Sequence, residues 1–175
     1  GANIGTTVTA QIIAFPLQDY SLLIVGIGAP LFIFARRDHW KAVGEILFGF
    51  GILFFGLYLM QSALLPLSAN QDILDFFLSF GKTPLFGVLA GLFVTAVIQS
   101  SAAAVSMTIA LAVSGLISLP GAVAFMLGTN IGTTLTAIFV SLSGSANAKR
   151  AALVHFLFNL LGVLAVLPFF SYFVA

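Results

Sequence analysis

The chain has 175 residues, of which 61% are hydrophobic and only 6% are charged, and its formal net charge is +1. A soluble domain carries roughly a quarter charged residues, so this composition excludes a water-soluble globular protein. The small net charge gives no indication of nucleic acid as a partner, and the absence of cysteine excludes disulfides and thiolate metal sites. We therefore expect an all-α integral membrane protein whose apolar helices cross a lipid bilayer.

The first part of the chain is expected to form helices separated by one charged turn. The decapeptide GANIGTTVTA occupies residues 1–10, and an apolar helix over residues 20–35 leads into the charged cluster RRDHWK at residues 36–41. Residues 42–65 are long and apolar enough to span a bilayer. Residues 66–82 are more polar, and they predict a loop or a helix that lies in the membrane interface.

The segment from residue 83 to residue 148 contains no Asp, Glu, Lys, Arg or His, yet it is not uniformly apolar. It holds eighteen Ser, Thr, Asn and Gln residues. Many of them gather in two groups, QSS at residues 99–101 and TNIGTT at residues 129–134. These two groups are the candidates for a functional site inside the membrane.

The QSS group is predicted to lie at the tip of a re-entrant hairpin over residues 83–116. As helices, residues 84–98 and 102–114 would each be at most about 22 Å long, which is shorter than the roughly 30 Å hydrocarbon core. The alternative is a pair of short, tilted spans with the serines at a bend. Non-helical backbone at membrane depth is tolerated only where protein or a watery cavity meets it, so the tip is a candidate site.

Residues 119–143 are predicted to form a broken span in which a second helix starts near Asn130. Gly128 and Gly132 weaken the continuation of a helix, and the Asn130 side chain can cap the free N–H groups of a new one. The alternative is that Gly128 and Gly132, four residues apart, let two helices pack closely. The same segment places three threonines on one helix face, namely Thr129, Thr133 and Thr136.

Charge distribution gives the expected orientation. Lys and Arg favour the cytoplasmic side of a membrane, so residues 36–41 and the AKR cluster at residues 148–150 should both be cytoplasmic. The decapeptide at residues 1–10 has a near copy, GTNIGTTLTA at residues 128–137, with eight of ten positions identical. With both clusters inside, the two copies cross the membrane in opposite directions. Such an inverted repeat is found in many secondary transporters, whose sites lie at broken helices near the midplane.

The repeat divides the chain into three parts. Residues 1–40 are the tail of the first repeat, residues 41–82 are a connecting transmembrane helix and interfacial loop, and residues 83–175 are the second repeat. Within the second repeat, the hairpin and the broken span are followed by a last helix over residues 148–171. The first residue is not Met and already lies in the repeated motif, so we expect a missing upstream segment of the same protein.

Five stretches of the sequence form a specific combination of motifs. They are QSSAAA, GTNIGTT about thirty residues later, the second copy GANIGTT, PLFGVLAGLFVTAVIQSS at residues 84–101 and AKRAALVHFLFN at residues 148–159. Together they resemble the type II sodium/phosphate cotransporter family, in its bacterial branch. In that family each inverted repeat carries one QSS-type tip and one GxNIGTT-like segment. Here the second repeat has both, and the first lacks its QSS.

The resemblance implies a sodium-dependent cotransporter of inorganic phosphate in the inner membrane, with inward movement driven by the sodium gradient. It implies no cofactor beyond sodium as the coupling ion. Oxygen ligands suit a hard cation, phosphate could sit at helix N-termini, and an arginine clamp within residues 83–148 is excluded. Carried over by position, the residues that bind phosphate and sodium, with individual roles unassigned, are Gln99, Ser100, Ser101, Asn130, Thr133, Thr134, Asn3, Thr6 and Thr7.

Two other functions fit the same residues. One keeps the carrier but changes the anion to sulfate or a carboxylate. The other is a non-transporting membrane packing or regulatory subunit, in which the Gly and Thr motifs only join helices. An enzyme is not expected, because the motifs of serine hydrolases, zinc proteases and dinucleotide-binding folds are absent from the sequence. His155 could be a proton relay, but with Asn159 one turn later we interpret it as a packing and hydrogen-bonding residue.

Overall fold

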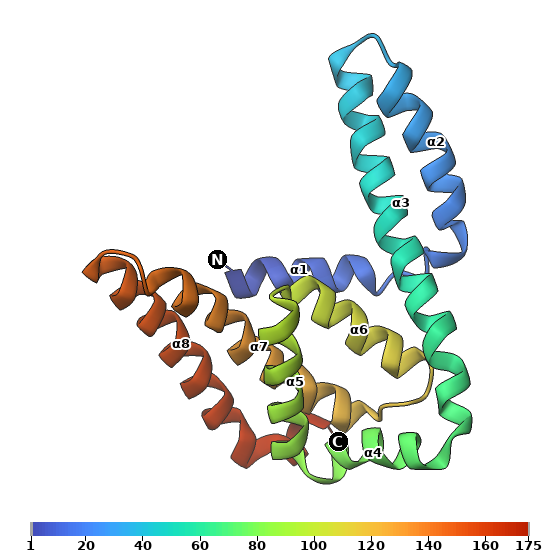
Figure 1. Cartoon of the computed structure of the whole chain (residues 1–175). Helices are drawn as coiled ribbons and strands as arrows, with labels where there is room; N and C mark the ends of the chain where they lie inside the picture. Colours follow the sequence, from blue (N-terminus) through green and yellow to red (C-terminus); the bar gives the residue numbers. More distant parts are fainter. Residues whose placement is uncertain (1, 175) are drawn as a thin grey trace.

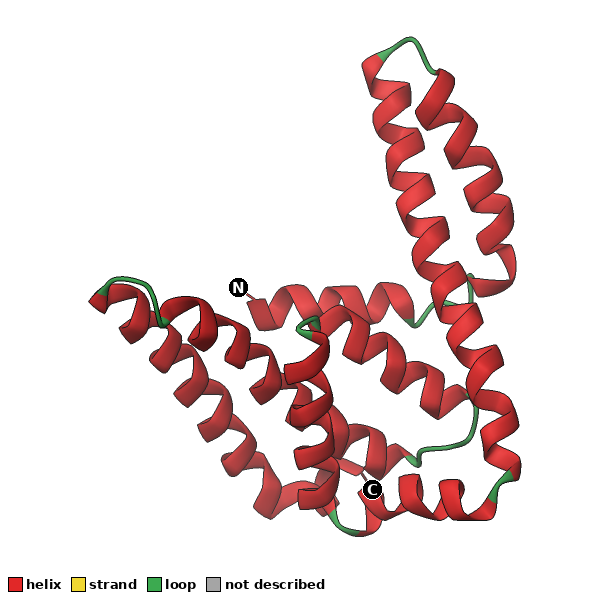
Figure 2. Ribbon diagram, in the orientation of Figure 1, coloured by secondary structure: helices red, strands yellow, loops and turns green. Residues whose placement is uncertain are grey.

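The computed structural model describes residues 2–174, and within that range it consists of helices joined by short loops, with no strand (Figure 2). The all-α fold expected from the composition is confirmed. Three short 3-10 helices lie between the longer ones: η1 (Gln18–Tyr20), η2 (Leu65–Ala69) and η3 (Leu167–Phe169). The α-helices are α1 (Ala2–Ile13), α2 (Ser21–Phe34), α3 (Asp38–Leu64), α4 (Gln71–Lys82), α5 (Pro84–Ile98), α6 (Ser101–Val113), α7 (Leu119–Ser141), α8 (Ala146–Val166) and α9 (Phe170–Val174).

Several of these helices have the length and composition of membrane spans. In the described part of the chain, two pairs of shorter helices are sharply bent at a break, by 72° between α1 and α2 and by 109° between α4 and α5. Three helical segments are long and apolar enough to cross a membrane by themselves: Asp38–Ala69, Leu119–Ser141 and Ala146–Val174. The chain is therefore an all-α membrane protein, while the inverted repeat stays a prediction.

The helix α2 and the first part of α3 form a two-helix arm that projects away from the rest of the molecule, while the rest of α3 runs along the body and packs against α6 (Figure 1). A Cβ atom at Gly28 or Gly44 would collide with the backbone of the partner helix, at Phe48 and Phe32 respectively. Glycine at these positions therefore lets the two backbones approach closely. The RRDHWK cluster lies at the tip of the arm, where α2 ends and α3 begins, and its side chains are mostly exposed.

The body of the molecule is built around α5 and α7, which pack along each other. A Cβ atom at Gly91 would collide with the Phe125 carbonyl, and one at Gly128 would collide with the Val88 carbonyl. The glycines of the second decapeptide thus serve helix packing, as the alternative interpretation of Gly128 and Gly132 predicted. One end of the body is filled by a buried apolar cluster of Phe80, Leu111, Leu116, Ile117 and Phe125.

The predicted break at Asn130 is wrong, because α7 runs without interruption from Leu119 to Ser141. Its N-cap is Ser118, whose side chain accepts a hydrogen bond from the Gly121 N–H group. The helix passes through Gly128 and Gly132 because the close packing of α5 against these glycines offsets their poor helix propensity. Asn130 therefore lies inside a helix and caps nothing.

The structure decides between a loop and a helix for residues 66–82, and it shifts the bounds of the last helix. Residues 66–82, interpreted as a loop or an interfacial helix, contain the helix α4, which Asn70 caps by accepting from the Asp72 and Ile73 N–H groups. The last helix, expected over residues 148–171, begins at Ala146 and ends at Val166. There the chain passes into η3, because Pro168 cannot continue a regular helix.

Candidate functional site

The QSS group forms the turn between α5 and α6. Gln99 adopts a left-handed conformation with φ 56° and ψ 24°, and its N–H group donates to the Thr95 carbonyl at 2.7 Å. This conformation costs a non-glycine residue roughly 1–2 kcal/mol, it is a common way to end a helix, and such strained residues also cluster at functional sites. Ser100 caps α6, because its Oγ accepts from the Ala103 N–H group at 3.2 Å. The residues that flank the turn are helical, as the sequence predicted.

An open hollow of about 570 Å³ lies where this turn meets α7, and we call it the tip hollow. Residues 99–102 of the turn form one wall, and Thr133, Thr136, Ala137 and Val140 of α7 form the other. Four of the predicted site residues, Gln99, Ser100, Ser101 and Thr133, therefore meet in one place. Thr136 joins them; the sequence had placed it on the same helix face as Thr133 without including it among the ligands.

The electrostatics of the tip hollow come from helix ends and neutral oxygens. No charged side chain lines it. The N–H groups of Ser101 and Ala102, at the start of the 13-residue α6, have no partner in the described chain, and the positive end of the helix dipole lies there. Such an end attracts an anion. Hydroxyl and amide oxygens in the same hollow suit a hard cation.

Two hydroxyl groups in the tip hollow, those of Thr133 and Ser100, differ in whether they can still donate a hydrogen bond to a ligand. The Thr133 Oγ1 donates to the Thr129 carbonyl of its own helix at 2.8 Å, so only its lone pairs remain available. The Ser100 Oγ accepts from a backbone N–H group, so its own proton remains available to an acceptor. Thr133 is thus suited to a cation and Ser100 to an anion.

The first decapeptide reaches the turn through one residue. The Thr6 Oγ1 lies 3.3 Å from the Ser101 Oγ, in a hydrogen bond whose donor can be either hydroxyl. Asn3 faces a different helix and donates from Nδ2 to the Oδ1 of Asn159 at 3.0 Å. Thr7 is exposed and donates to the Asn3 carbonyl at 2.9 Å. Of the three residues predicted from this copy, the structure places only Thr6 against the turn.

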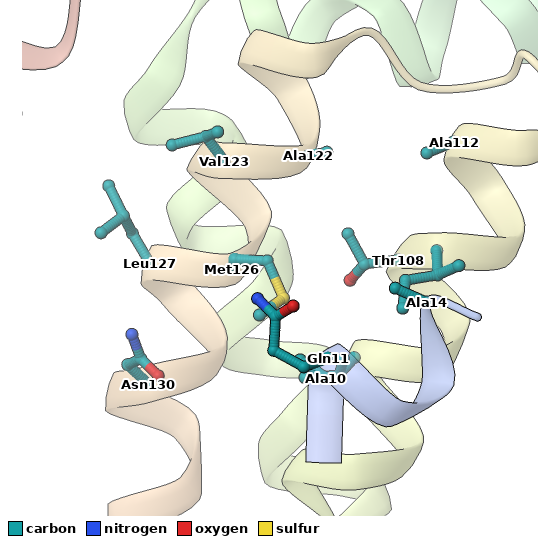
Figure 3. Close-up of a pocket in the computed structure, with 12 residues that line it drawn as sticks. Ala10, Gln11, Ala14, Thr108, Ala112, Ala122, Val123, Met126, Leu127 and Asn130 are labelled. Atoms are coloured by element: carbon teal, nitrogen blue, oxygen red, sulfur yellow. The ribbon is translucent and has the colours of Figure 1, made fainter. Parts of the chain in front are cut away.

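Asn130, predicted as a ligand, lines a second hollow of about 430 Å³ between α1, α6 and α7. Figure 3 shows its amide on α7, with Gln11 on α1 and Thr108 on α6 as the other polar side chains of a mainly apolar lining. Thr134, also predicted, is fully buried, and its hydroxyl donates to the Ile131 carbonyl at 2.7 Å. The structure therefore separates Asn130 and Thr134 from the tip hollow.

The structure also shows a polar contact that the sequence did not predict. Asn159 is buried, donates to the His155 carbonyl at 2.9 Å and accepts from Asn3. The spacing of one helical turn between His155 and Asn159 was the one indication in the sequence that Asn159 forms hydrogen bonds. The contact with Asn3 could not be predicted in this way, because it joins residues far apart in the chain. Within the described residues, no group of three or more His, Cys, Asp and Glu side chains is placed to hold a metal ion.

Comparison with known proteins gives one family and several relatives. The sequence model of the Na+/Pi-cotransporter family matches residues 1–62 and 63–171. The "Uncharacterized protein YqeW" of Bacillus subtilis is 33% identical over 171 residues, which is 98% of this chain and 55% of YqeW. The "Putative inorganic phosphate export protein YjbB" of Escherichia coli is 32% identical over 169 residues, 97% of this chain and 31% of YjbB.

A human protein shares a shorter region. The "Sodium-dependent phosphate transport protein 2B" of Homo sapiens is 31% identical over 140 residues, which covers 74% of this chain and 20% of the human protein. No solved structure gives a significant match. The chain thus spans about half of YqeW and about a third or less of the other two relatives.

Proposed function

The chain belongs to the Na+/Pi-cotransporter family, and from this premise we propose that it is part of a carrier that moves inorganic phosphate across a membrane with sodium. The proposal concerns the full-length carrier, since the chain spans only 55% of YqeW and less of YjbB. We place the carrier in the inner membrane, with residues 36–41 and 148–150 on the cytoplasmic side.

We propose that phosphate binds in the tip hollow, at the start of α6. The observation that carries this proposal is the convergence of the α6 N-terminus, the Ser100 hydroxyl and the α7 threonines on one uncharged hollow. Phosphate would accept hydrogen bonds from the free N–H groups of Ser101 and Ala102 and from the Ser100 hydroxyl. An anion held by neutral donors can leave more readily than one held by arginine, which suits a carrier.

Sodium is proposed to bind beside the phosphate, on the α7 side of the tip hollow. Thr133 offers lone pairs because its proton is already donated, and the Gln99 amide offers an oxygen at the turn. A cation placed there would also offset the charge of the phosphate across the hollow. This arrangement explains why transport of the anion would require sodium, since neither wall carries a positive side chain.

The test is uptake of radioactive phosphate by the full-length carrier in liposomes, with and without an inward sodium gradient. We expect uptake only with sodium, and we expect Ser100→Ala to raise the half-saturating phosphate concentration at least about 10-fold, the worth of a hydrogen bond to a charged group. Ser143→Ala is the matched control, because Ser143 is exposed and outside the hollow. Uptake that persists without sodium, or that Ser100→Ala leaves unchanged, would contradict the proposal.

The direction of transport is open to a direct experiment. We propose inward movement, whereas the relative YjbB, named a putative inorganic phosphate export protein, favours export as the second candidate function. Liposomes loaded with phosphate and given an outward sodium gradient measure whether the same carrier also releases phosphate with sodium. Inward movement in cells predicts that a strain without other phosphate carriers grows on low phosphate only when it expresses the carrier. Export predicts a lower internal phosphate content instead.

The same liposomes separate phosphate from the other anions and from a purely structural role. Sulfate or a carboxylate as the true substrate would compete with labelled phosphate and would itself be taken up with sodium. A packing or regulatory subunit would show no sodium-dependent uptake of any of these anions. Either outcome would replace the phosphate proposal.

A further inference from the structure

We infer that Asn159 on α8 is a positioning residue for the tip hollow, because it anchors the first decapeptide so that Thr6 lies against Ser101. The inference rests on the proposed function for its consequence in transport. Its geometry, however, is a property of the fold and can be tested without transport. Asn159 itself does not line the tip hollow.

The side chain of Asn159 is held in one orientation by two hydrogen bonds. It is only 4% exposed and is the one polar member among the buried residues of α8. Its Nδ2 donates to the His155 carbonyl at 2.9 Å, which leaves Oδ1 turned toward α1, where it accepts from the Asn3 Nδ2 at 3.0 Å. A buried amide in an apolar helix is costly unless it has partners, so this orientation is strongly preferred.

The bond to Asn159 and the contact with Ser101 lie within one helical turn of each other on α1. Asn3 and Thr6 are three residues apart and therefore lie on neighbouring positions of one helix face. Asn3 is fixed on α8, while Thr6 meets the first residue of α6 through the contact of its Oγ1 with the Ser101 Oγ at 3.3 Å. α1 packs chiefly against α6, and its last residue, Ile13, is buried with Phe54 and Leu57 of α3, so the bond to Asn159 adds an attachment at the opposite, N-terminal end. Attachment at both ends fixes the rotation and the sliding of α1.

The second decapeptide shows what the motif does without this anchor. The offset of 127 residues that relates Asn3 to Asn130 also relates Asn159 to Phe32. Phe32 stacks on Phe48, and its helix α2 packs along α3. In the described chain no hydrogen bond joins the Asn130 amide to another residue, and the amide lines the hollow of Figure 3 instead. The anchor therefore comes from outside the motif and serves one copy only.

The first test measures the position of α1 directly. The chain has no cysteine, so Thr6→Cys and Ser101→Cys can be introduced together in a cysteine-free full-length carrier and their disulfide formation followed in membranes. We expect Asn159→Ala to slow the cross-link several-fold. Asn3→Ala should slow it equally, and Asn3 is exposed, so this variant keeps the test valid if Asn159→Ala fails to fold. Asn147→Ala, at an exposed position near the start of α8, is the matched control.

The second test separates positioning from a general loss of stability. Without the anchor, we expect the half-saturating phosphate concentration to rise about 2- to 10-fold, the worth of one hydrogen bond, while the maximal rate per folded carrier stays the same. The double variant with Asn3→Ala and Asn159→Ala should equal either single variant, because both remove the same bond. A cross-linking rate unchanged by both single variants, or additive effects in the double variant, would overturn the inference. Failure of phosphate transport in the unaltered carrier would overturn the proposed function. The cross-linking result would then still decide whether Asn159 positions α1.

Discussion

The helix pairs α2 with α3 and α5 with α7 share the most extensive contacts in the described part of the chain. Both pack through glycine, but they differ in what surrounds the contact. In both pairs a Cβ atom at the central glycines would collide with the backbone of the partner helix. The arm of α2 and α3 has almost no polar side chain along α2, whereas α5 and α7 bury Thr95, Thr129 and Thr134 and form the tip hollow at their end. Glycine packing therefore builds the scaffold and does not by itself mark a site.

The threonines of the body show the second half of this lesson. The buried hydroxyls of Thr95, Thr129 and Thr134 all donate to carbonyls of their own helices, so they are satisfied within the packing. Thr133 makes the same kind of bond but is half-buried and lines the tip hollow. Position relative to the hollow, and not residue type, separates candidate ligands from packing residues.

The largest effect is expected from Gly128→Leu in the α5 and α7 contact. The side chain would meet the Val88 backbone, which cannot move without separating the two helices, so we expect a loss of about 3 kcal/mol or more of stability. The full-length carrier should lose its folded fraction in size-exclusion chromatography together with phosphate uptake. A folded, active Gly128→Leu carrier would show that this contact is not the scaffold of the hollow.

A large effect confined to the hollow is expected from Thr133→Val. Loss of a sodium ligand should raise the half-saturating sodium concentration of phosphate uptake about 10-fold or more, the worth of an interaction with a charged group. The matched variant is Thr134→Val, one residue away and buried, which should cost about 1 kcal/mol of stability and leave sodium dependence unchanged. Equal half-saturating sodium concentrations in the two variants would show that Thr133 is not a sodium ligand.

A smaller and two-sided effect is expected from Gln99→Gly. Glycine adopts the left-handed conformation of the turn without strain, so the free energy of unfolding should rise by roughly 1 kcal/mol. Uptake should fall several-fold, because the amide oxygen at the hollow is removed. Gln99→Asn, which keeps an amide and tolerates this conformation, should lie between the two. A Gln99→Gly carrier with full activity would show that the amide serves only the turn.

The smallest effect on transport is expected from Gly44→Leu in the arm. The clash with the Phe32 backbone resembles that at Gly128, and it should cost about 1–3 kcal/mol of stability in the arm. The tip hollow is formed by the turn between α5 and α6, the start of α6 and α7, so the half-saturating concentrations of phosphate and sodium should not change in the folded fraction. A change in either concentration would show that the arm is coupled to the site.

Local features of the sequence predicted much of this molecule. Composition predicted the all-helical membrane fold, and the short apolar lengths on either side of QSS predicted two short helices. The polar turn between them predicted three residues of the tip hollow, Gln99, Ser100 and Ser101, and the second decapeptide predicted Thr133. These features depend on neighbours in the chain, so they can be read without knowing the tertiary contacts. The membrane placement of the hairpin and the inverted repeat stay predictions.

Tertiary contacts decided what the sequence left out or predicted wrongly. The glycines near Asn130 suggested a helix break, but the backbone of α5 fills the space beside them and keeps α7 continuous. The bond between Asn3 and Asn159 joins residues 156 positions apart, and no local pattern indicates it. For the same reason, the two nearly identical decapeptides predicted equal roles, while the structure places their asparagines in different surroundings.

Protection of a single cysteine tests the central claim, that phosphate and sodium occupy the tip hollow, most directly. The full-length, otherwise cysteine-free carrier would carry Thr136→Cys in the tip hollow, or Gln11→Cys in the hollow of Figure 3 as the control. Labelling by a water-soluble thiol reagent should slow at position 136 when phosphate and sodium are present together, and should stay unchanged at position 11. Equal labelling of Thr136→Cys with and without the two ions, or protection at position 11 alone, would contradict the assignment of the site.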